Sequence, residues 1–310
     1  MAAHTSRVLV IGAPRSGTTW VAEVLGATPH TKLIHEPDNP DPNPQAWRAR
    51  ELHGWYPVLR SGERYIDYER IWDLAFAGGW PTSSPAVAAG HILRRLPPPM
   101  RHLLLVGLGA MTRRVGRHST NLVVKSVHAA FCVEWLIDRY SPRIILVQRN
   151  PLSVIASWIA LDMPVGDLAT NRRVRADYID RWGLPSVDEW APKLDQIAWS
   201  VGLLMTVLQR QAQSHPEWIV VRHEDLCIDP TRELRLLAGQ VGLEWSENAE
   251  RRLLASQVQG SGYETRRVAR ELPDKWRERY KPGQIPAVMT ILAGFPDLRL
   301  FLPSESEESA

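Results

Sequence analysis

The residues best suited to chemistry lie close to the start of the chain, between Gly12 and Trp20. Here the sequence reads GAPRSGTTW, after an all-apolar run at 8–11 and before a stretch with helical spacing of apolar residues. This order predicts a buried strand, a glycine-flanked turn and a helix. Backbone N–H groups of such a turn converge with the positive end of the helix dipole, so the segment predicts a site for a multiply charged anion, with Arg15 as a nearby cation.

The spacing of Gly12 and Gly17 matches a nucleotide-triphosphate P-loop, but Thr18 stands where such a loop carries lysine. With arginine inside the loop and tryptophan after the two threonines, the segment 14–20 resembles the 5′-phosphosulfate loop of one family of sulfotransferases. These enzymes use 3′-phosphoadenosine 5′-phosphosulfate (PAPS), and their loop has the form P-[KR]-[SAT]-G-T-T-W. The resemblance implies that Arg15 neutralises charge on the bridging oxygen and that Trp20 stacks on adenine. It implies a cofactor-binding set of Pro14, Arg15, Ser16, Gly17, Thr18, Thr19 and Trp20.

A second pair of candidate residues is Arg149 and Ser157. Arg149 follows an apolar run at 143–147, and Asn150-Pro151 then gives a good cap and first turn for a helix that carries Ser157. An arginine at the carboxyl end of a strand, with a hydroxyl two helical turns on, is suited to holding a phosphate. The spacing resembles the family's 3′-phosphate motif, R-N-P-x-x-x-x-x-S.

Two later segments resemble the family more weakly. In VVRHEDL at 220–226, His223 stands where the family's tyrosine packs near adenine. The basic stretch at 263–280 resembles a segment that closes over the 3′-phosphate, and there Arg266 and Arg267 are the best candidates.

The sequence leaves two candidates for the general base that activates an acceptor hydroxyl. Glu36 follows a short strand at 31–34, where carbohydrate-type members keep a catalytic glutamate. His128 lies after Lys125, resembling the K-T-H of phenol and steroid members with one extra residue. A structural ion pair for Glu36 and a helix-start hydrogen bond for His128 are the alternatives. The spacing favours Glu36, and Lys125 is expected to lie near the leaving sulfate as a second cation.

The elements that position these residues alternate between strand and helix. This alternation predicts an α/β protein with three layers, a P-loop-like fold in which helices flank a central, mainly parallel sheet. Proline-rich residues 37–57 are expected to hold no regular element. The expected strands are 8–11, 31–34, 121–125, 143–147 and 218–221, and the expected helices begin at 18 and cover 65–77, 130–140, 152–161, 188–214 and 230–241.

We expect one sulfotransferase domain at 1–303, with insertions at about 37–118 and 162–190 and a disordered acidic tail at 304–310. Residues 86–118 contain six arginines and no acidic residue. A helical hairpin over the active site is the favoured interpretation of this segment. A peripheral contact with anionic membrane lipid is the alternative.

Composition narrows the class of protein. The 310 residues carry a net charge of only +3, so basic surface is local and no nucleic-acid partner is expected. Neither of the two cysteines has metal-type spacing, and both are predicted to be buried, reduced thiols. No signal peptide is visible, and the longest apolar run, 103–111, is too short to span a bilayer, so a cytoplasmic location is expected.

The resemblance implies a sulfotransferase that moves the sulfuryl group of PAPS, in line, to a hydroxyl of a small molecule, sugar or glycolipid. A sulfuryl group carries less charge than a phosphoryl group, so no metal is expected to be required. One rival is a kinase or NTPase with a degenerate P-loop, but the apolar strands end in Lys125, Gln148 and Arg222 rather than aspartate. The other rival is a non-catalytic nucleotide-binding or membrane-surface protein.

Overall fold

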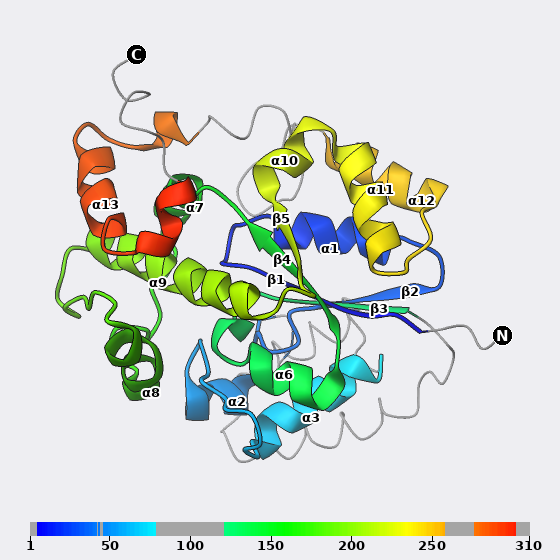
Figure 1. Ribbon diagram of the computed structural model, residues 1–310, viewed down its shortest axis with the longest axis horizontal. Helices are drawn as coiled ribbons and strands as arrows, with labels where there is room; N and C mark the ends of the chain where they lie inside the picture. The colour runs from blue at the N-terminus through cyan, green and yellow to red at the C-terminus, as the bar shows by residue number, and fades with distance from the viewer. Residues whose placement is uncertain (1–4, 42, 44–45, 79–120, 258–275, 302–310) are drawn as a thin grey trace.

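Five strands form one parallel sheet in the order β2-β3-β1-β4-β5 in the computed structural model, which describes residues 5–41, 43, 46–78, 121–257 and 276–301 (Figure 1). Each strand is short and rich in β-branched residues, as expected for strands covered on both faces. Their bounds are β1 (Arg7–Ile11), β2 (Thr31–His35), β3 (Asn121–Ser126), β4 (Arg143–Gln148) and β5 (Ile219–Arg222).

The register brings the carboxyl ends of all five strands to one edge of the sheet. Ile11 of β1 pairs with Ser126 of β3 and with Leu146 of β4. The chain leaves β1 at the centre of the sheet, and its neighbours β3 and β4 lie on opposite sides. Parallel sheets bind ligands at such a switch point, outside the carboxyl ends of the strands.

Helices cover both faces of the sheet. One face packs Val8 and Val10 against Leu25 and Leu237, while the other packs Leu9 against a larger cluster that includes Val201. The first layer holds α1 (Thr18–Gly26), α10 (His223–Ile228), α11 (Pro230–Gln240) and α12 (Glu247–Ser256). The second holds α2 (Ala46–His53), α3 (Ile66–Phe76), α6 (Val133–Tyr140), α7 (Pro151–Ala160), α9 (Lys193–Ser214) and α13 (Gln284–Leu292).

Shorter helical elements complete the described chain. They are η1 (Ala129–Phe131), α8 (Arg172–Val174), the π-helix η2 (Arg175–Asp180), η4 (Arg277–Arg279) and η5 (Pro296–Phe301). The three-layer α/β architecture expected from the sequence is confirmed, and the sheet is wholly parallel. Cys132 and Cys227 are free and buried, as predicted.

The prediction that 37–57 holds no regular element is wrong, because α2 occupies Ala46–His53. Ala46 and Ala49 are buried against the core, and this contact stabilises a helix that local proline content disfavours. Gly54 follows at φ 80, and its N–H donates to the carbonyl of Arg50 at 2.8 Å. Glycine is the residue that most readily ends a helix in this way.

The helix expected at 188–214 begins five residues later, at Lys193. Pro192 restricts the residue before it to extended backbone, so the helix starts only after the proline. As a consequence Trp190, which the helix predicted at 188–214 would contain, precedes α9 and is 85% exposed.

Several predictions fall outside the described residues. These concern the segment 86–118, Arg266, Arg267 and the tail at 304–310. The single-domain boundaries at 1–303 and the insertions at 37–118 and 162–190 stay predictions. Of the helices that the structure describes, none combines the length and apolar character needed to cross a membrane.

Candidate active site

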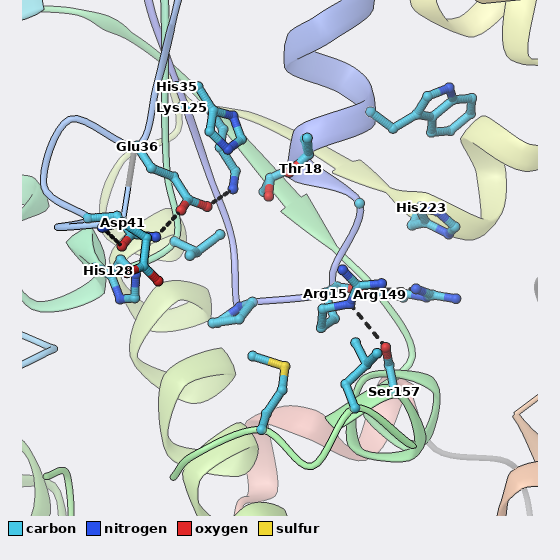
Figure 2. Close-up of a pocket in the computed structure, with 18 of the residues that line it drawn as sticks. Arg15, Thr18, His35, Glu36, Asp41, Lys125, His128, Arg149, Ser157 and His223 are labelled. Carbon is cyan, nitrogen blue, oxygen red and sulfur yellow. Dashed lines mark hydrogen bonds and ion pairs between the residues drawn. The ribbon is translucent and has the colours of Figure 1, made fainter. Parts of the chain in front are cut away.

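A cavity of about 710 Å³ lies at the carboxyl edge of the sheet (Figure 2). Its walls contain one candidate residue from the segment after each strand, namely Arg15, Glu36, His128, Arg149 and His223. The cavity therefore brings together residues that the sequence spreads over more than two hundred positions.

The wall next to α1 is the glycine-flanked turn predicted from the sequence. Gly17 has φ 98, and a Cβ atom at this position would lie 2.3 Å from Cδ2 of His223. Only glycine therefore allows the turn to approach His223 so closely. Helix α1 starts at the next residue, and its N-terminus borders the cavity through Thr18 and Thr19.

Arg15 lies between the two other phosphate-motif residues. Its Nε donates to Ser157 Oγ at 3.1 Å, and its carbonyl oxygen accepts a hydrogen bond from Arg149 Nη1 at 3.0 Å. Trp158 Nε1 also donates to the Pro14 carbonyl oxygen at 3.0 Å. The second half of α7, together with Arg149 before the helix, is thus fastened to the turn after β1, and Arg149 and Ser157 both contact Arg15.

The turn from β4 into α7 has two anchors of its own. The Asn150 side chain accepts a hydrogen bond from the N–H of Leu152 at 2.9 Å, as the predicted N-cap. Glu224, in α10, accepts from the backbone N–H of Asn150 at 2.9 Å. These contacts fix where Arg149 leaves the sheet.

This side of the cavity is rich in positive charge. Burial lowers the pKa of Arg149 to about 10, and the charges of Arg15 and Arg279 act in the same direction, against Glu224. Arg149 stays a cation at neutral pH. Within the described part of the chain, Arg149 Nε is buried and has no hydrogen-bond partner, whereas Ser16, predicted to bind the cofactor, is buried in the turn and does not line the cavity. A buried donor without a partner is costly, so the Arg149 side of the wall is suited to an anion that would satisfy it.

The opposite side of the cavity holds the two candidate bases. Lys125 and Glu36 are both buried and form an ion pair, and Asn39 Nδ2 donates to the second carboxylate oxygen. Burial alone would raise the pKa of Glu36. The charge of Lys125, with smaller contributions from His35 and His128, outweighs burial and holds this pKa at about 2.

His128 lies beside the rings of Trp55 and Tyr56, with centroid distances of 5.4 and 5.5 Å. Burial lowers the pKa of His128 to about 4, so the imidazole is neutral at pH 7. Its Nδ1 is buried and makes no hydrogen bond to any residue that the structure describes. A neutral imidazole that borders the cavity is able to accept a proton.

Trp20 and His223, the residues predicted to contact adenine, lie close together and are mostly buried. The Trp20 indole donates through Nε1 to Ser256 Oγ of α12 at 2.9 Å, and its ring meets His223 edge-on at 5.8 Å. Both residues contribute to the cavity wall. Stacking of Trp20 on adenine stays a prediction.

Several residues that line the cavity were not identified from the sequence. Arg279 lies within the basic stretch at 263–280, and Tyr280 anchors that end through a 2.8 Å hydrogen bond from its hydroxyl to the Leu152 carbonyl. Trp55 and Tyr56 follow the unpredicted helix α2, so no motif marked them. Other lining residues without a motif include Asn39, Pro164, Gly166 and Gln257.

A metal site was not expected. In the residues for which the structure gives positions, no group of three or more His, Cys, Asp and Glu side chains is arranged to hold a metal ion. Whether the reaction requires a metal stays a prediction from the sequence.

Solved structures that resemble the chain include three sulfotransferases. The sulfotransferase domain of the Synechococcus PCC 7002 olefin synthase is 16% identical, covers 95% of this chain and 96% of that one, and has a TM-score of 0.49. Mouse sulfotransferase SULT7A1 complexed with PAP is 12% identical over 98% and 86%, with a TM-score of 0.48. The sulfotransferase domain from the curacin biosynthetic pathway is 13% identical over 93% and 98%, with a TM-score of 0.46.

Comparison with curated protein sequences found no match. A family model described as "Sulfotransferase family" matches residues 7–247, which contain all five strands and every wall of the cavity except Gln257 and Arg279. Because this match covers well over half of the chain, the protein belongs to the sulfotransferase family.

Proposed function

We propose that the protein transfers the sulfuryl group of PAPS to a hydroxyl of a small organic acceptor. The observation that carries this proposal is one cavity with two chemically different sides. Arginines and helix N–H donors line the side of the β1–α1 turn, and a buried Lys125–Glu36 pair with a neutral His128 lines the other. The first side suits an anionic donor, and the second suits a hydroxyl.

The residues present fit PAPS. The backbone of Gly17 and Thr18 and the hydroxyl of Thr19 would hold the 5′ phosphosulfate at the N-terminus of α1. Arg149 and Ser157 would hold the 3′-phosphate, with Arg279 as a further cation beside Arg149. When bound, PAPS supplies a sulfuryl group whose bond to the phosphate oxygen breaks as a bond to the acceptor oxygen forms.

The roles of the chain's own residues follow from their charge states. Arg15 offsets negative charge at the bridging oxygen, as a donor held in place before the charge develops. Lys125 contributes a second buried positive charge, and Glu36 holds it in place. His128 takes the acceptor proton in this proposal. Its imidazole is neutral and its Nδ1 makes no hydrogen bond within the described residues, whereas the Glu36 carboxylate is held by Lys125 and Asn39. The proposal therefore departs from Glu36, which the spacing favoured.

A thermal-shift comparison tests this function. PAP at saturating concentration should raise Tm, whereas ATP with magnesium and GTP with magnesium should not. Arg149→Ala should abolish the response to PAP. Arg143→Ala, at the exposed start of the same strand, is the matched control and should keep the response.

The same assay separates the rivals. Stabilisation by a magnesium nucleotide, with none by PAP, would favour the kinase or NTPase and overturn the proposal. Stabilisation by PAP without transfer of ³⁵S from PAPS to any hydroxyl compound in a broad acceptor panel would favour a non-catalytic binding protein.

A further inference from the structure

The acceptor side of the cavity continues past Trp55 into a second hollow. This outer hollow has a volume of about 690 Å³ and shares Trp55, Pro164 and Gly166 with the reaction cavity. Its other walls are Val165, Asp167, Ala191, Lys193 and Gln196. The two hollows therefore adjoin at Trp55, Pro164 and Gly166, on the side of the reaction cavity that holds His128 and toward the start of α9.

The shared wall is held in a fixed position. Asp167 Oδ1 accepts a hydrogen bond from the N–H of Trp55 at 3.2 Å. A Cβ atom on Gly54 would lie 2.0 Å from Asp167 Oδ2, so the glycine allows the two loops to meet. The guanidinium of Arg50 also stacks over the Trp55 ring, and the indole in turn contacts His128. Trp55 is thus a preorganised surface between the reaction centre and the outer hollow.

Each polar side chain of the outer hollow already has a partner within the chain. Gln196 Nε2 donates to the carbonyl oxygens of Glu189 at 2.9 Å and Ala191 at 2.8 Å. Asp167 is held by Trp55, and Lys193 forms an ion pair with Asp162. The surface left for a ligand is mostly the carbon of Pro164, Val165, Ala191 and the Trp55 ring.

We infer that the acceptor is an elongated, largely apolar alcohol. Its hydroxyl lies at Glu36, Lys125 and His128, and its apolar body extends over Trp55 into the outer hollow. A sugar is disfavoured there, because burying several hydroxyls without new hydrogen-bond partners is costly. This inference rests on the proposed function and narrows its acceptor class.

Binding of primary alkanols tests the inference without requiring turnover. Calorimetry on the PAP-saturated protein should give a Kd that tightens from 1-butanol through 1-hexanol to 1-octanol. The expected gain is about threefold to fourfold per methylene, the effect of burying one CH₂ group. Glucose, as a polar probe with the same number of carbon atoms as hexanol, should show no saturable binding.

A variant locates the apolar body of the ligand. Ala191→Phe fills the outer hollow and should weaken 1-octanol at least tenfold, while the Kd for 1-butanol stays within twofold. Ala255→Phe, on the exposed surface of α12 across the sheet, is the matched control and should change neither. Should Ala191→Phe lower Tm, Ala191→Leu is the milder variant and should show the same selectivity in smaller degree.

The outcomes separate the two proposals. Loss of PAP binding in the unmodified protein would overturn the proposed function itself. With PAP binding intact, an alkanol Kd that does not depend on chain length would overturn the acceptor inference alone. Tighter binding of glucose than of hexanol would do the same, as would an Ala191→Phe effect equal for butanol and octanol.

Discussion

Arg15 combines an unusual backbone conformation with a side chain held at the centre of the site. Its φ is 75, in a region that non-glycine residues seldom adopt, and such residues concentrate at functional sites. Its Nε contacts Ser157, while its carbonyl oxygen contacts Arg149. Side chain and backbone thus both help to join the two phosphate-binding segments.

Arg15→Ala should lower kcat by about 10²–10³, or roughly 3–4 kcal/mol of barrier, because one fixed donor to the developing charge is lost. The Kd for PAP should change only a few-fold, since Arg149 and the α1 N-terminus remain. Rapid-quench sulfation and PAP calorimetry measure the two quantities. Retention of full turnover would show that Arg15 has no catalytic role.

The choice between His128 and Glu36 is also made at the scale of residues. With His128 as the base, kcat/KM should be constant above about pH 5 and decrease below it with an apparent pKa of about 4. His128→Ala should remove this acidic limb along with most of the activity. Glu36→Gln should move the limb to lower pH, because the Glu36 carboxylate raises the pKa of His128.

The measurement is a pH–rate profile, with circular dichroism at each pH to establish that the protein is folded. If Glu36→Gln rather than His128→Ala removes the pH dependence, Glu36 is the base and the assignment is wrong.

At the scale of elements, α7 determines the site more than any other helix. It presents Ser157 and Trp158 to the β1–α1 turn, and Tyr280 ties the η4 segment, with Arg279, to its first turn. The position of α7 depends on its N-terminus, where Asn150 provides the cap. Loss of this cap would displace Arg149, Arg279 and the Ser157 hydroxyl together.

Asn150→Ala should lower the free energy of unfolding by about 1 kcal/mol, the usual cost of losing an N-cap side chain. Asn150→Ser keeps a capping oxygen and should restore most of this loss. Urea denaturation of the three proteins measures both effects. Equal stabilities for Asn150→Ala and the unmodified protein would mean that the cap contributes nothing to α7.

At the scale of the whole molecule, a buried carboxyl links stability to pH. Asp38 lies behind the Lys125–Glu36 pair, where Ser126 Oγ donates to it at 2.7 Å. Burial raises the pKa of Asp38 to about 7. The folded state therefore keeps a proton on Asp38 up to about pH 7, whereas the unfolded state releases it near pH 4. The contribution of Asp38 to the free energy of unfolding is full below about pH 4 and is lost as the pH rises toward 7.

Asp38→Asn should remove this part of the pH dependence. From pH 4 to pH 7 the free energy of unfolding of the unmodified protein should fall relative to that of the variant. The fall should be at most about 1.4 kcal/mol per pH unit. Urea denaturation at several pH values measures it, and Asp180→Asn, on an exposed carboxylate, is the control. A difference that is constant across this range would contradict the role of Asp38.

The sequence by itself determined the features that depend on neighbouring residues. Apolar runs predicted all five strands, and the order Gly12 to Trp20 predicted the turn and the start of α1. Asn150-Pro151 predicted the start of α7, which in turn placed Ser157. These features could be predicted because strand alternation, glycine conformations and helix caps act over about ten residues.

The meeting of distant residues depends on how the whole chain packs. This packing paired Lys125 with Glu36, placed Trp55 beside His128 and brought Arg279 near Arg149. These contacts join segments on different strands and loops, and no local pattern records the strand order that brings them together. The same reason explains α2, which tertiary packing stabilises and local composition did not predict.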